Sequence, residues 1–574
     1  MWNGEQGLTW LPPDAPPVEA ACPNCGDVAP KRPVLLLPWP EAPAGKAVRL
    51  LRCGACGCGF VHPAHVPDYA AQPQGGAAAL AFYLQQGANV RGIAFNLARL
   101  GPPAGTRFLE VGCGFGFGLD FARRALGWTV LGLDPSPFAA AGRDMLGLPI
   151  ENRYLERDDA AAAGQYDVVM ASEVVEHIAA PPGFVRTLAG ALRPGGRLVL
   201  TTPDVEALTP DTPPGLAVPL LSLGYHLVLQ SARSLDLLLR NAGLEQVHVR
   251  RSGGASLVGE AQLGTHAAAA PMEEPAFDAL FRRWLSEAAA AVERGGDLWI
   301  GLMVRAYRAA VNAADVETAD SLWLDIVAAC EARYRARPEE MKGPAGPSLE
   351  HLAQQEPICL GPLLLHRAFH RLLRGEPRAT VEPLFEAAAA AAGRLRAALG
   401  RIGTDDGDAE DIAWVARAEA ILCAAERGAP DLVARLDALG PAPADPAGAR
   451  ARSIRRRAYV GLVNAARFDL AGQMEAVVAE AMALPAGEAG GDDALDLLYC
   501  AGVRELQVAG GSAERALERL GRLRDEAARA RAGGRTGGSA MTLAGPGRKA
   551  TVLALRRLGR HEEAVRLERE PDPS

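Results

Sequence analysis

The sequence predicts an α/β fold with a doubly wound, mainly parallel sheet, preceded by a small cysteine-rich module and followed by an all-α region. Three observations predict this order. Short apolar strands alternate with helical segments between about residues 106 and 250, which is typical of βαβ units in a sheet covered on both faces. Two Cys-x-x-Cys pairs precede that region, and Ala, Leu, Arg and Glu dominate after about residue 272. A chain of 574 residues is long enough for several hydrophobic cores.

The alternating region is organised around the stretch RFLEVGCGFGFG. Residues 107–111 predict a buried strand, and Gly112, Gly114 and Gly116 follow at once, before a helical period begins. Backbone can approach a ligand closely at glycine, because no Cβ intervenes. Further buried strands are predicted at 128–134, 166–171 and 197–202, the last after a helix end and tight turn at 192–196.

Two acidic residues indicate which class of ligand this loop binds. Ligands of such sheets bind beyond the carboxyl ends of the strands, so Glu110, Asp134 and the glycine loop are expected to meet there. Asp134 is placed to accept hydrogen bonds from ribose hydroxyls, which fits both NAD and S-adenosylmethionine. The third glycine of a dinucleotide fingerprint falls on Phe117, and Glu110 would repel a pyrophosphate. A cationic nucleoside is therefore favoured over NAD, and an NAD oxidoreductase is disfavoured.

Residues 106–250 resemble a class I S-adenosylmethionine-dependent methyltransferase with a Rossmann-like sheet. The matching motifs are FLEVGCGFGFG, VLGLDPS, YDVVMASEVVEHI, LRPGGRLVLTTPD and YHLVLQSARSLDLLLRNAGL. The resemblance implies that S-adenosylmethionine is the cofactor. It implies these cofactor-binding residues: Glu110, Gly112, Gly114, Gly116, Asp134, Pro135, Leu155, Glu156, Ser172 and Glu173. Asp158 and Asp159 compete with Leu155 and Glu156 for the position beside adenine.

His177 and His226 are the candidate catalytic residues. A hydroxyl acceptor gains from a general base, and a histidine with a pKa near neutrality suits that task. The alternative for each is a packed or hydrogen-bonded histidine. Residues 209–219 are expected to cover the acceptor site. Tyr83 and Asn89 are candidates to touch the ligand, with a surface or core role as the alternative.

Four cysteines near the start of the chain predict a structural zinc ion. Cys22, Cys25, Cys53 and Cys56 form two knuckles, each followed by glycine, and four thiolates suit tetrahedral Zn²⁺. The gap between the knuckles is longer than usual, and Cys58 is an alternative to Cys56. The other interpretation is a pair of disulfides or unrelated thiols, and a cytosolic location disfavours disulfides. A zinc ribbon before a methyltransferase domain is a pairing found in bacterial proteins that resemble this one.

The C-terminal region reads as helix–turn–helix pairs, for example 298–313 with 316–334, 410–427 with 430–439, and 551–558 with 562–568. The last pair resembles a tetratricopeptide-like half repeat. The helix pairs do not recur with a strict repeat length, so a degenerate α-solenoid and an irregular helical domain are both compatible with the sequence. This region is expected to dock a protein partner or carrier.

The expected domains are a zinc ribbon at 1–70, a methyltransferase domain at 71–260 and a helical domain at 270–574. The formal charge of −8 gives no general attraction to nucleic acid. No signal peptide or membrane span is expected, so the predicted location is the cytoplasm.

The predicted function is methyl transfer from S-adenosylmethionine to a small-molecule or glycan-type acceptor, with O-methylation favoured. The resemblance suggests sugar methylation. The alternative is a non-catalytic scaffold, in which the helical region binds proteins and the methyltransferase fold is degenerate.

Overall fold

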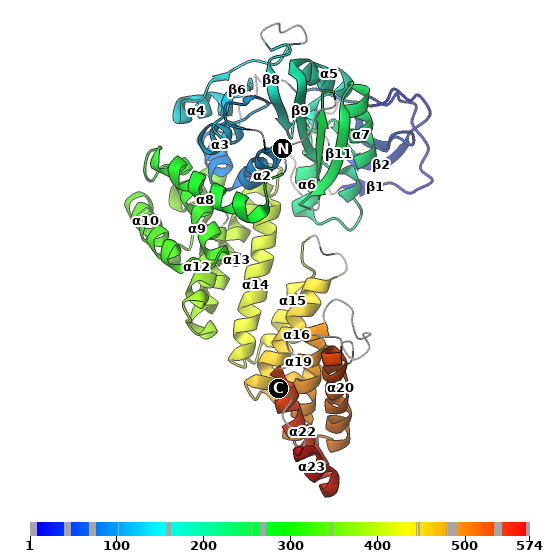
Figure 1. The fold of residues 1–574 in the computed structure, drawn as a ribbon, viewed down its shortest axis with the longest axis vertical. Helices are drawn as coiled ribbons and strands as arrows, with labels where there is room; N and C mark the ends of the chain where they lie inside the picture. Colours follow the sequence, from blue (N-terminus) through cyan, green and yellow to red (C-terminus); the bar gives the residue numbers. More distant parts are fainter. Residues whose placement is uncertain are drawn as a thin grey trace. The chain divides into compact units, whose positions relative to one another are not determined.

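The structure is a computed structural model of the chain (Figure 1). It describes residues 8–38, 48–67, 76–101, 103–156, 162–253, 255–264, 271–344, 346, 348–443, 445, 448–477, 479, 491–532 and 542–569. The chain divides into two compact units. Unit 1 holds residues 1–366 and 390–410, and unit 2 holds residues 367–389 and 411–574.

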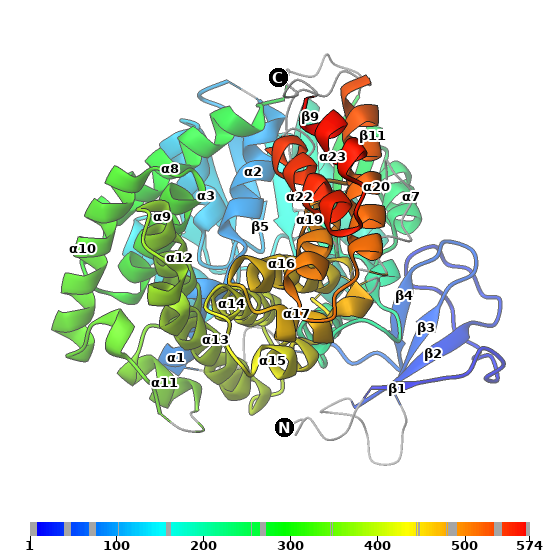
Figure 2. The same ribbon diagram turned by 90° about the horizontal axis from the view of Figure 1, so that it is seen from below.

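Unit 1 begins with a small antiparallel sheet, drawn in blue in Figure 2. Its own strands are β1 (Thr9–Trp10), β2 (Arg32–Leu37), β3 (Val48–Arg52) and β4 (Gly59–His62). The sheet has a fifth strand, β10 (Val228–Leu229), which comes from much later in the chain and pairs antiparallel with β4. Alternating buried positions such as Leu35, Leu37 and Leu50 give the sheet an apolar face.

The central sheet of unit 1 has seven strands in the order β11-β12-β9-β8-β5-β6-β7. The bounds are β5 (Arg107–Val111), β6 (Thr129–Leu133), β7 (Ile150–Glu151), β8 (Tyr166–Ser172), β9 (Leu192–Pro203), β11 (Glu245–Ser252) and β12 (Ser256–Gln262). Strands β7, β6, β5, β8 and β9 run parallel, whereas β12 and β11 are added antiparallel. The α/β fold class is thereby confirmed. The turn expected at 192–196 is instead part of β9, whose pairing with β8 shifts between Tyr166 and Val168.

Helices cover both faces of this sheet (Figure 1). The elements are α1 (Gly76–Phe82), the π-helix η1 (Tyr83–Gly87), α2 (Val90–Leu100), α3 (Phe117–Ala125), α4 (Pro137–Leu146), η2 (Val175–His177), α5 (Pro181–Ala191), η3 (Val205–Ala207), α6 (Pro214–Leu221) and α7 (Ala232–Asn241). Leu188 of α5 and Leu235 of α7 pack into one core with Leu109 and Val169 of the strands. Their burial drives the packing of these two helices on one face.

The first helices of the C-terminal region also belong to unit 1. They are α8 (Glu274–Ala290), α9 (Asp297–Asn312), α10 (Val316–Tyr334), η4 (Pro338–Glu340) and α11 (Leu349–Gln355). Helix α8 packs on α2 and α3, where the rings of Phe121 and Trp284 meet edge to face, 5.5 Å apart. Trp284 also donates to buried Asp120 at 3.0 Å. This part of the helical region is therefore built onto the α/β sheet.

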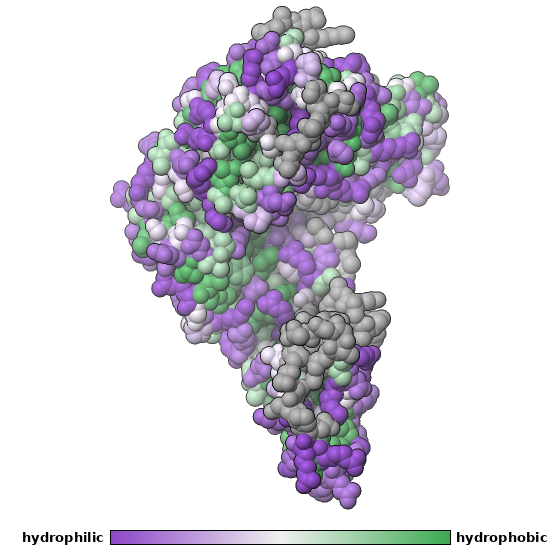
Figure 3. Space-filling model, viewed as in Figure 1, coloured by the Kyte–Doolittle hydropathy of each residue, from purple (hydrophilic) through white to green (hydrophobic). Residues whose placement is uncertain are grey.

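The division between the units falls inside α12 (Leu360–Leu373), α13 (Arg378–Gly400) and α14 (Gly407–Glu426). The later helices are α15 (Leu432–Leu439), α16 (Ala449–Asn464), α17 (Phe468–Gln473), α19 (Gly491–Gln507), α20 (Ala513–Ala532), α22 (Ala544–Arg557) and α23 (His561–Glu568). In the view of Figure 3, hydrophilic side chains dominate the end of unit 2 where α23 lies.

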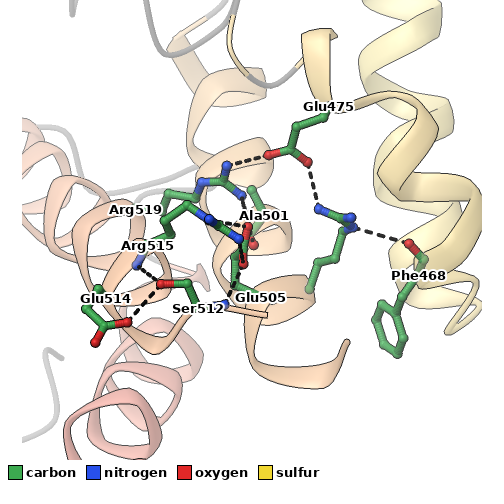
Figure 4. Close-up of polar contacts among 9 residues, drawn as sticks. Phe468, Glu475, Ala501, Glu505, Ser512, Glu514, Arg515 and Arg519 are labelled. Carbon is green, nitrogen blue, oxygen red and sulfur yellow. Dashed lines mark hydrogen bonds and ion pairs between the residues drawn. The ribbon is translucent and has the colours of Figure 1, made fainter. Parts of the chain in front are cut away.

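An ion-pair cluster ties α20 to α19 within unit 2 (Figure 4). The Arg519 guanidinium lies between the carboxylates of Glu475 and Glu505, and Arg515 pairs with Glu505 at 3.1 Å. Glu505 also accepts from the backbone of Ser512 at 2.9 Å, at the start of α20. The helical C-terminal region is confirmed. None of the described helices combines the length and apolar character that crossing a bilayer needs.

Candidate functional site

The glycine loop lies between β5 and α3 and turns on left-handed backbone. Gly112, Gly114 and Gly116 have φ values of 72°, 51° and 87°. A Cβ at Gly112 would lie 2.4 Å from a methyl carbon of Val174, and one at Gly114 would lie 2.9 Å from the Tyr83 hydroxyl. Side chains are therefore excluded from this loop by both conformation and space.

Asp134 joins the loop from the end of β6. Its carboxylate accepts from the Gly114 N–H at 2.8 Å and from the Ser136 N–H at 2.7 Å. Only 8% of the residue is exposed. Pro135 follows and is half-buried, and Ser136 caps α4. The structure thus brings Asp134 and the loop together at the carboxyl ends of two parallel strands, where sheets of this kind bind ligands.

Glu110 lies beneath the start of α3. It is 2% exposed, and a Cβ at Gly118 would stand 2.7 Å from both of its carboxyl oxygens. Within the described part of the chain, Oε2 of Glu110 has no hydrogen-bond partner. Burial is the main cause that raises the pKa of Glu110 to about 8, and the negative charge of nearby Asp134 is the second cause. A buried carboxyl with an unsatisfied oxygen fits a ligand that carries a positive charge.

The residues expected beside adenine lie farther along the same edge. Leu155 is partly buried and packs against the core that contains Leu109, whereas Glu156 is exposed. Asp158 and Asp159, the competing candidates, lie outside the described residues. Both alternatives for the residues beside adenine, the pair 155–156 and the pair 158–159, therefore stay predictions.

Ser172 is the last residue of β8, which pairs with β5 on the side away from β6, and Glu173 follows it. The Ser172 hydroxyl lies 2.7 Å from that of Thr201 on β9, and Thr201 also donates to Oε1 of Glu173 at 2.8 Å. Glu173 is exposed and has a φ of 55°, a left-handed conformation that is uncommon outside glycine. Strained residues of this kind concentrate at functional sites.

The two candidate catalytic histidines, His177 and His226, are neighbours in the structure. They are far apart in the sequence, because 48 positions separate His177 from Tyr225 and His226 comes directly after Tyr225. The rings of His177 and His226 lie 4.7 Å apart and nearly perpendicular. Nδ1 of His177 lies 3.2 Å from the Tyr225 carbonyl oxygen, and Nδ1 of His226 lies 2.7 Å from that of Leu220. Burial lowers the pKa of His177 to about 4 and that of His226 to about 3, so both rings are neutral at pH 7.

Glu176 completes this group. It is fully buried, and its Oε2 accepts from the Thr202 hydroxyl at 3.0 Å. Its Oε1 lies 3.9 Å from Nε2 of His226. The sequence predicts both histidines as catalytic candidates, whereas it marks Glu176 only as the partner of His177 in the YDVVMASEVVEHI motif.

Tyr83 reaches the glycine loop from the π-helix η1. Its ring lies 6.3 Å from that of Phe117 and 5.2 Å from that of Phe138. Burial and the nearby Glu110 and Asp134 raise the pKa of Tyr83. Asn89, the other candidate ligand contact, is exposed and accepts from the Gly92 N–H at 3.1 Å as the N-cap of α2.

The C-terminal helices of unit 1 hold the π-helix in place. Gln85 donates to Asp297 at 2.7 Å, and Gln86 donates to Asp406 at 2.6 Å. Arg305 donates to the Leu84 carbonyl oxygen at 2.7 Å, and its guanidinium lies 5.8 Å from the Phe117 ring centre. A cavity of about 800 Å³ lies beside η1, lined by residues that include Gln86, Arg305 and Asp406. No sequence pattern marks this contact, because it joins segments more than 200 residues apart.

The four predicted zinc ligands come together between the two knuckles. The sulfur atoms of Cys22 and Cys56 lie 3.8 Å apart, and those of Cys25 and Cys53 lie 3.7 Å apart. Thiolates about 2.3 Å from one tetrahedral Zn²⁺ would be roughly 3.8 Å apart, so the donor set fits. Cys58 is fully buried, with its sulfur 3.4 Å from that of Cys22, so it stays an alternative to Cys56. A metal held by these thiolates would leave no open position for chemistry.

The knuckles also contact the α/β sheet. Asn24 accepts from the side chain of Gln230 at 3.3 Å and donates to the Ser234 carbonyl oxygen at 3.3 Å. The Ser231 hydroxyl donates to the carbonyl oxygen of Cys56 at 3.4 Å. These bonds fix the N-terminal module against β10 and α7, immediately after His226.

The central part of the chain is similar in sequence to known proteins. Residues 84–249 match a family described as a methyltransferase domain. A ubiquinone biosynthesis O-methyltransferase of Methylobacterium sp. (strain 4-46) is 41% identical over 106 residues, which are 18% of this chain and 42% of the relative. Its counterpart in Xanthomonas axonopodis pv. citri (strain 306) is 35% identical over 154 residues, 25% of this chain and 64% of the relative.

A solved S-adenosylmethionine-dependent methyltransferase from Mesorhizobium loti is 20% identical and has a TM-score of 0.26. The similarity covers 30% of this chain and 100% of that structure. The chain spans about two fifths of the length of the first curated relatives that it matches. The family match coincides with the sheet, the glycine loop and both histidines, and residues 84–249 of this chain are a methyltransferase domain.

Proposed function

We propose that this chain transfers a methyl group from S-adenosylmethionine to a hydroxyl group of a small molecule. The observation that carries the proposal is the grouping of Glu110, Asp134 and the glycine loop at the carboxyl ends of β5 and β6. Its backbone admits a closely placed ligand, and its two carboxyl groups favour a cationic nucleoside over a pyrophosphate.

Each of these residues has a proposed partner on the cofactor. Asp134 would exchange its bond from the Gly114 N–H for hydrogen bonds from the ribose hydroxyls. Glu110 would take the amino group, because its Oε2 is buried and unsatisfied among the described residues. Leu155 or Glu156 would lie beside adenine, with Pro135 on the approach to it.

The acceptor would bind on the side of Ser172, Glu173, His177 and His226. Methyl transfer from a sulfonium is an in-line displacement, so holding the two reactants close and aligned supplies much of the rate. Oxygen is favoured as the acceptor atom because the two similar relatives are named O-methyltransferases. Because both histidines are neutral at pH 7, either one would accept a hydrogen bond from the acceptor hydroxyl.

The four-cysteine cluster would hold zinc as a structural ion. The first C-terminal helices would serve the same enzyme, since α9 anchors η1 and thereby Tyr83. Docking of a protein partner by the helical region, a glycan acceptor and a cytoplasmic location stay predictions.

Isothermal titration with S-adenosylhomocysteine tests the cofactor site. Saturable binding of one ligand per chain is expected, and its absence in the wild-type protein would favour the scaffold interpretation. Incubation with methyl-labelled S-adenosylmethionine and a cell extract then identifies the acceptor. Label on a carbon or nitrogen atom of the product would contradict O-methylation.

A further inference from the structure

We propose that a cavity in unit 2 binds a carboxylate group of a single negative charge through the guanidinium of Arg456. The cavity has a volume of about 470 Å³. Sites for small ligands have volumes of about 300–1,000 Å³. Residues of α13, α14, α16 and α19 line the cavity, and all of them belong to unit 2. The proposal is therefore independent of the methyltransferase domain and its cofactor site.

Helix α16 supplies one wall of the cavity. Arg456, Val460 and Asn464 follow one another at intervals of four residues, so they lie on one face of the helix, and all three line the cavity. Gly461 allows this helix to approach α14 closely, because a Cβ there would lie 3.2 Å from Cβ of Ala425. The wall therefore combines a buried arginine, an apolar side chain and an exposed amide at the end of the helix.

Arg456 has no partner for its charge in the described part of the chain. It lies in a run of three arginines, of which Arg455 and Arg457 are exposed, whereas Arg456 is only 8% exposed. Its Nε is buried without a hydrogen-bond partner, and no described carboxylate forms an ion pair with it. Arginine is rarely buried in proteins unless it is paired.

A second buried arginine of unit 2 shows the usual arrangement. Arg519 is 7% exposed, and its guanidinium lies between the carboxylates of Glu475 and Glu505 (Figure 4). Unit 2 thus provides two counter-charges for one buried arginine and none for Arg456. A buried cation without a counter-charge is strongly destabilising. Because Arg456 also lines a cavity, we infer that a bound anion supplies the missing charge.

The other charged residues of the cavity limit the charge of that anion. Arg378 pairs with Glu419 at 2.9 Å and with Glu426 at 3.1 Å, and Arg457 lies 3.6 Å from Glu419. These two arginines are therefore already neutralised. Glu426 and Asp496 also line the cavity and would repel a dianion such as phosphate. A carboxylate has one charge and two oxygen atoms, which match the parallel N–H groups of a guanidinium.

The remaining lining residues indicate what carries the carboxylate. Leu422 and Val460 give the cavity an apolar side, which suits a hydrocarbon group next to the carboxylate. Asn464 is exposed, and its amide can donate and accept a hydrogen bond. The C-terminal residue of a polypeptide would use all three features, and an apolar organic acid would use the first two. Both sources share a carboxylate on an apolar group.

Ligand-observed NMR titration of the full-length protein tests the site with three probes. They are acetyl-alanyl-leucine, its C-terminal amide and isovalerate. Both acids should bind, and the amide should bind at least about tenfold more weakly than its acid, because it lacks the charge. Tighter binding of acetyl-alanyl-leucine than of isovalerate would identify a polypeptide terminus as the source. Equal binding of the two acids would identify an organic acid.

Two variants of Arg456 locate the binding. Arg456→Gln should weaken both acids at least about tenfold. It should also raise the melting temperature of the ligand-free protein, because it removes an unpaired buried charge, whereas loss of a purely structural arginine would lower it. Arg456→Lys keeps the charge without the planar fork, so it tests the site if Arg456→Gln fails to fold; both acids should bind it at least about threefold more weakly.

Arg455→Gln is the matched control, since it removes the same charge from an exposed position of the same helix. It should bind both acids as the wild type does. The proposal is overturned if the wild-type protein binds neither acid, if the amide binds as tightly as its acid, or if inorganic phosphate binds more tightly than both acids. Variants of Arg456 that bind the acids as well as Arg455→Gln does would also overturn it.

Discussion

The backbone N–H of Leu227 donates a hydrogen bond to the carbonyl oxygen of Glu176 at 2.7 Å. The carbonyl oxygen of Leu227 in turn accepts from Val61, on β4 of the N-terminal module, at 2.9 Å. Leu227 thus connects the cysteine-rich sheet to η2 of the methyltransferase domain, on the side proposed for the acceptor. His226 precedes it directly, so the pairing of β4 with β10 fixes where that histidine lies.

The first prediction concerns the zinc ion in this module. The Cys53→Ser variant should lose about one zinc per chain, because three thiolates hold Zn²⁺ less well than four. It should also unfold at a lower temperature, since metal binding contributes directly to the folding of such modules. Cobalt substitution, followed by the sulfur-to-cobalt absorption band, reports on the thiolate site alone.

The control for this prediction is Cys500→Ala, which removes an isolated buried thiol of α19 in unit 2. It should leave the cobalt band unchanged. An equally strong band in Cys53→Ser would show that this cysteine is not a ligand.

The second prediction concerns Asp134. Replacing it with alanine should abolish measurable S-adenosylhomocysteine binding, because the ribose hydroxyls would lose their acceptor. The circular dichroism spectrum should stay that of the wild type. Asp144→Ala is the matched control, since the side chain of Asp144 on α4 is 69% exposed and pairs only with Arg143 among the described residues. Unchanged affinity in Asp134→Ala would count against the proposed cofactor site.

The third prediction is a pH dependence of cofactor binding through Glu110. In the free protein its carboxyl group is protonated below a pH of about 8, so a cationic ligand must displace a proton there. The affinity should therefore rise with pH, by up to about tenfold per unit below the pKa, and level off above it. Titration calorimetry between pH 6 and pH 9 measures this profile.

The Glu110→Gln variant isolates the effect. Its side chain cannot ionise, so it should bind S-adenosylhomocysteine more weakly, with a flat pH profile. Glu151→Gln, at a half-exposed acid of β7, should keep the wild-type profile. A flat profile in the wild-type protein would mean that Glu110 does not meet the ligand's charge.

The sequence was sufficient to predict the parallel strands and the glycine loop. Buried strands of a parallel sheet are continuous apolar runs, and Gly112 and Gly114 mark a backbone that tolerates no side chain. Asp134 was predictable for the same reason, because a strand end fixes its place. These features are local in the chain, so periodicity and composition reveal them.

The remaining parts of the site depend on long-range packing. Strand β10 has two residues, too few to show a period, yet it completes the N-terminal sheet. The contact between His177 and His226 depends on that pairing. The π-helix η1 has no sequence signature. Its residue Gln85 donates to Asp297 of α9, a helix that the sequence predicts to belong to a separate domain.

The last prediction tests whether the C-terminal helices support the cofactor site through η1. Gly301 lies inside α9, where a Cβ would stand 2.3 Å from the Leu84 carbonyl oxygen and 2.9 Å from Cα of Gln85. Glycine to alanine inside a helix ordinarily stabilises it by about 1 kcal/mol. Gly301→Ala should do the opposite, because the new methyl group forces η1 away from α9.

Displacement of η1 moves Tyr83, whose hydroxyl lies close to Gly114, so the affinity for S-adenosylhomocysteine should fall together with the melting temperature. Gly393→Ala is the matched control. It lies in α13 within unit 1, and a Cβ there meets no atom within 4 Å. Gly393→Ala should raise the melting temperature slightly and leave the affinity unchanged. If Gly301→Ala behaves in the same way, η1 does not transmit the packing of the helices to the cofactor loop.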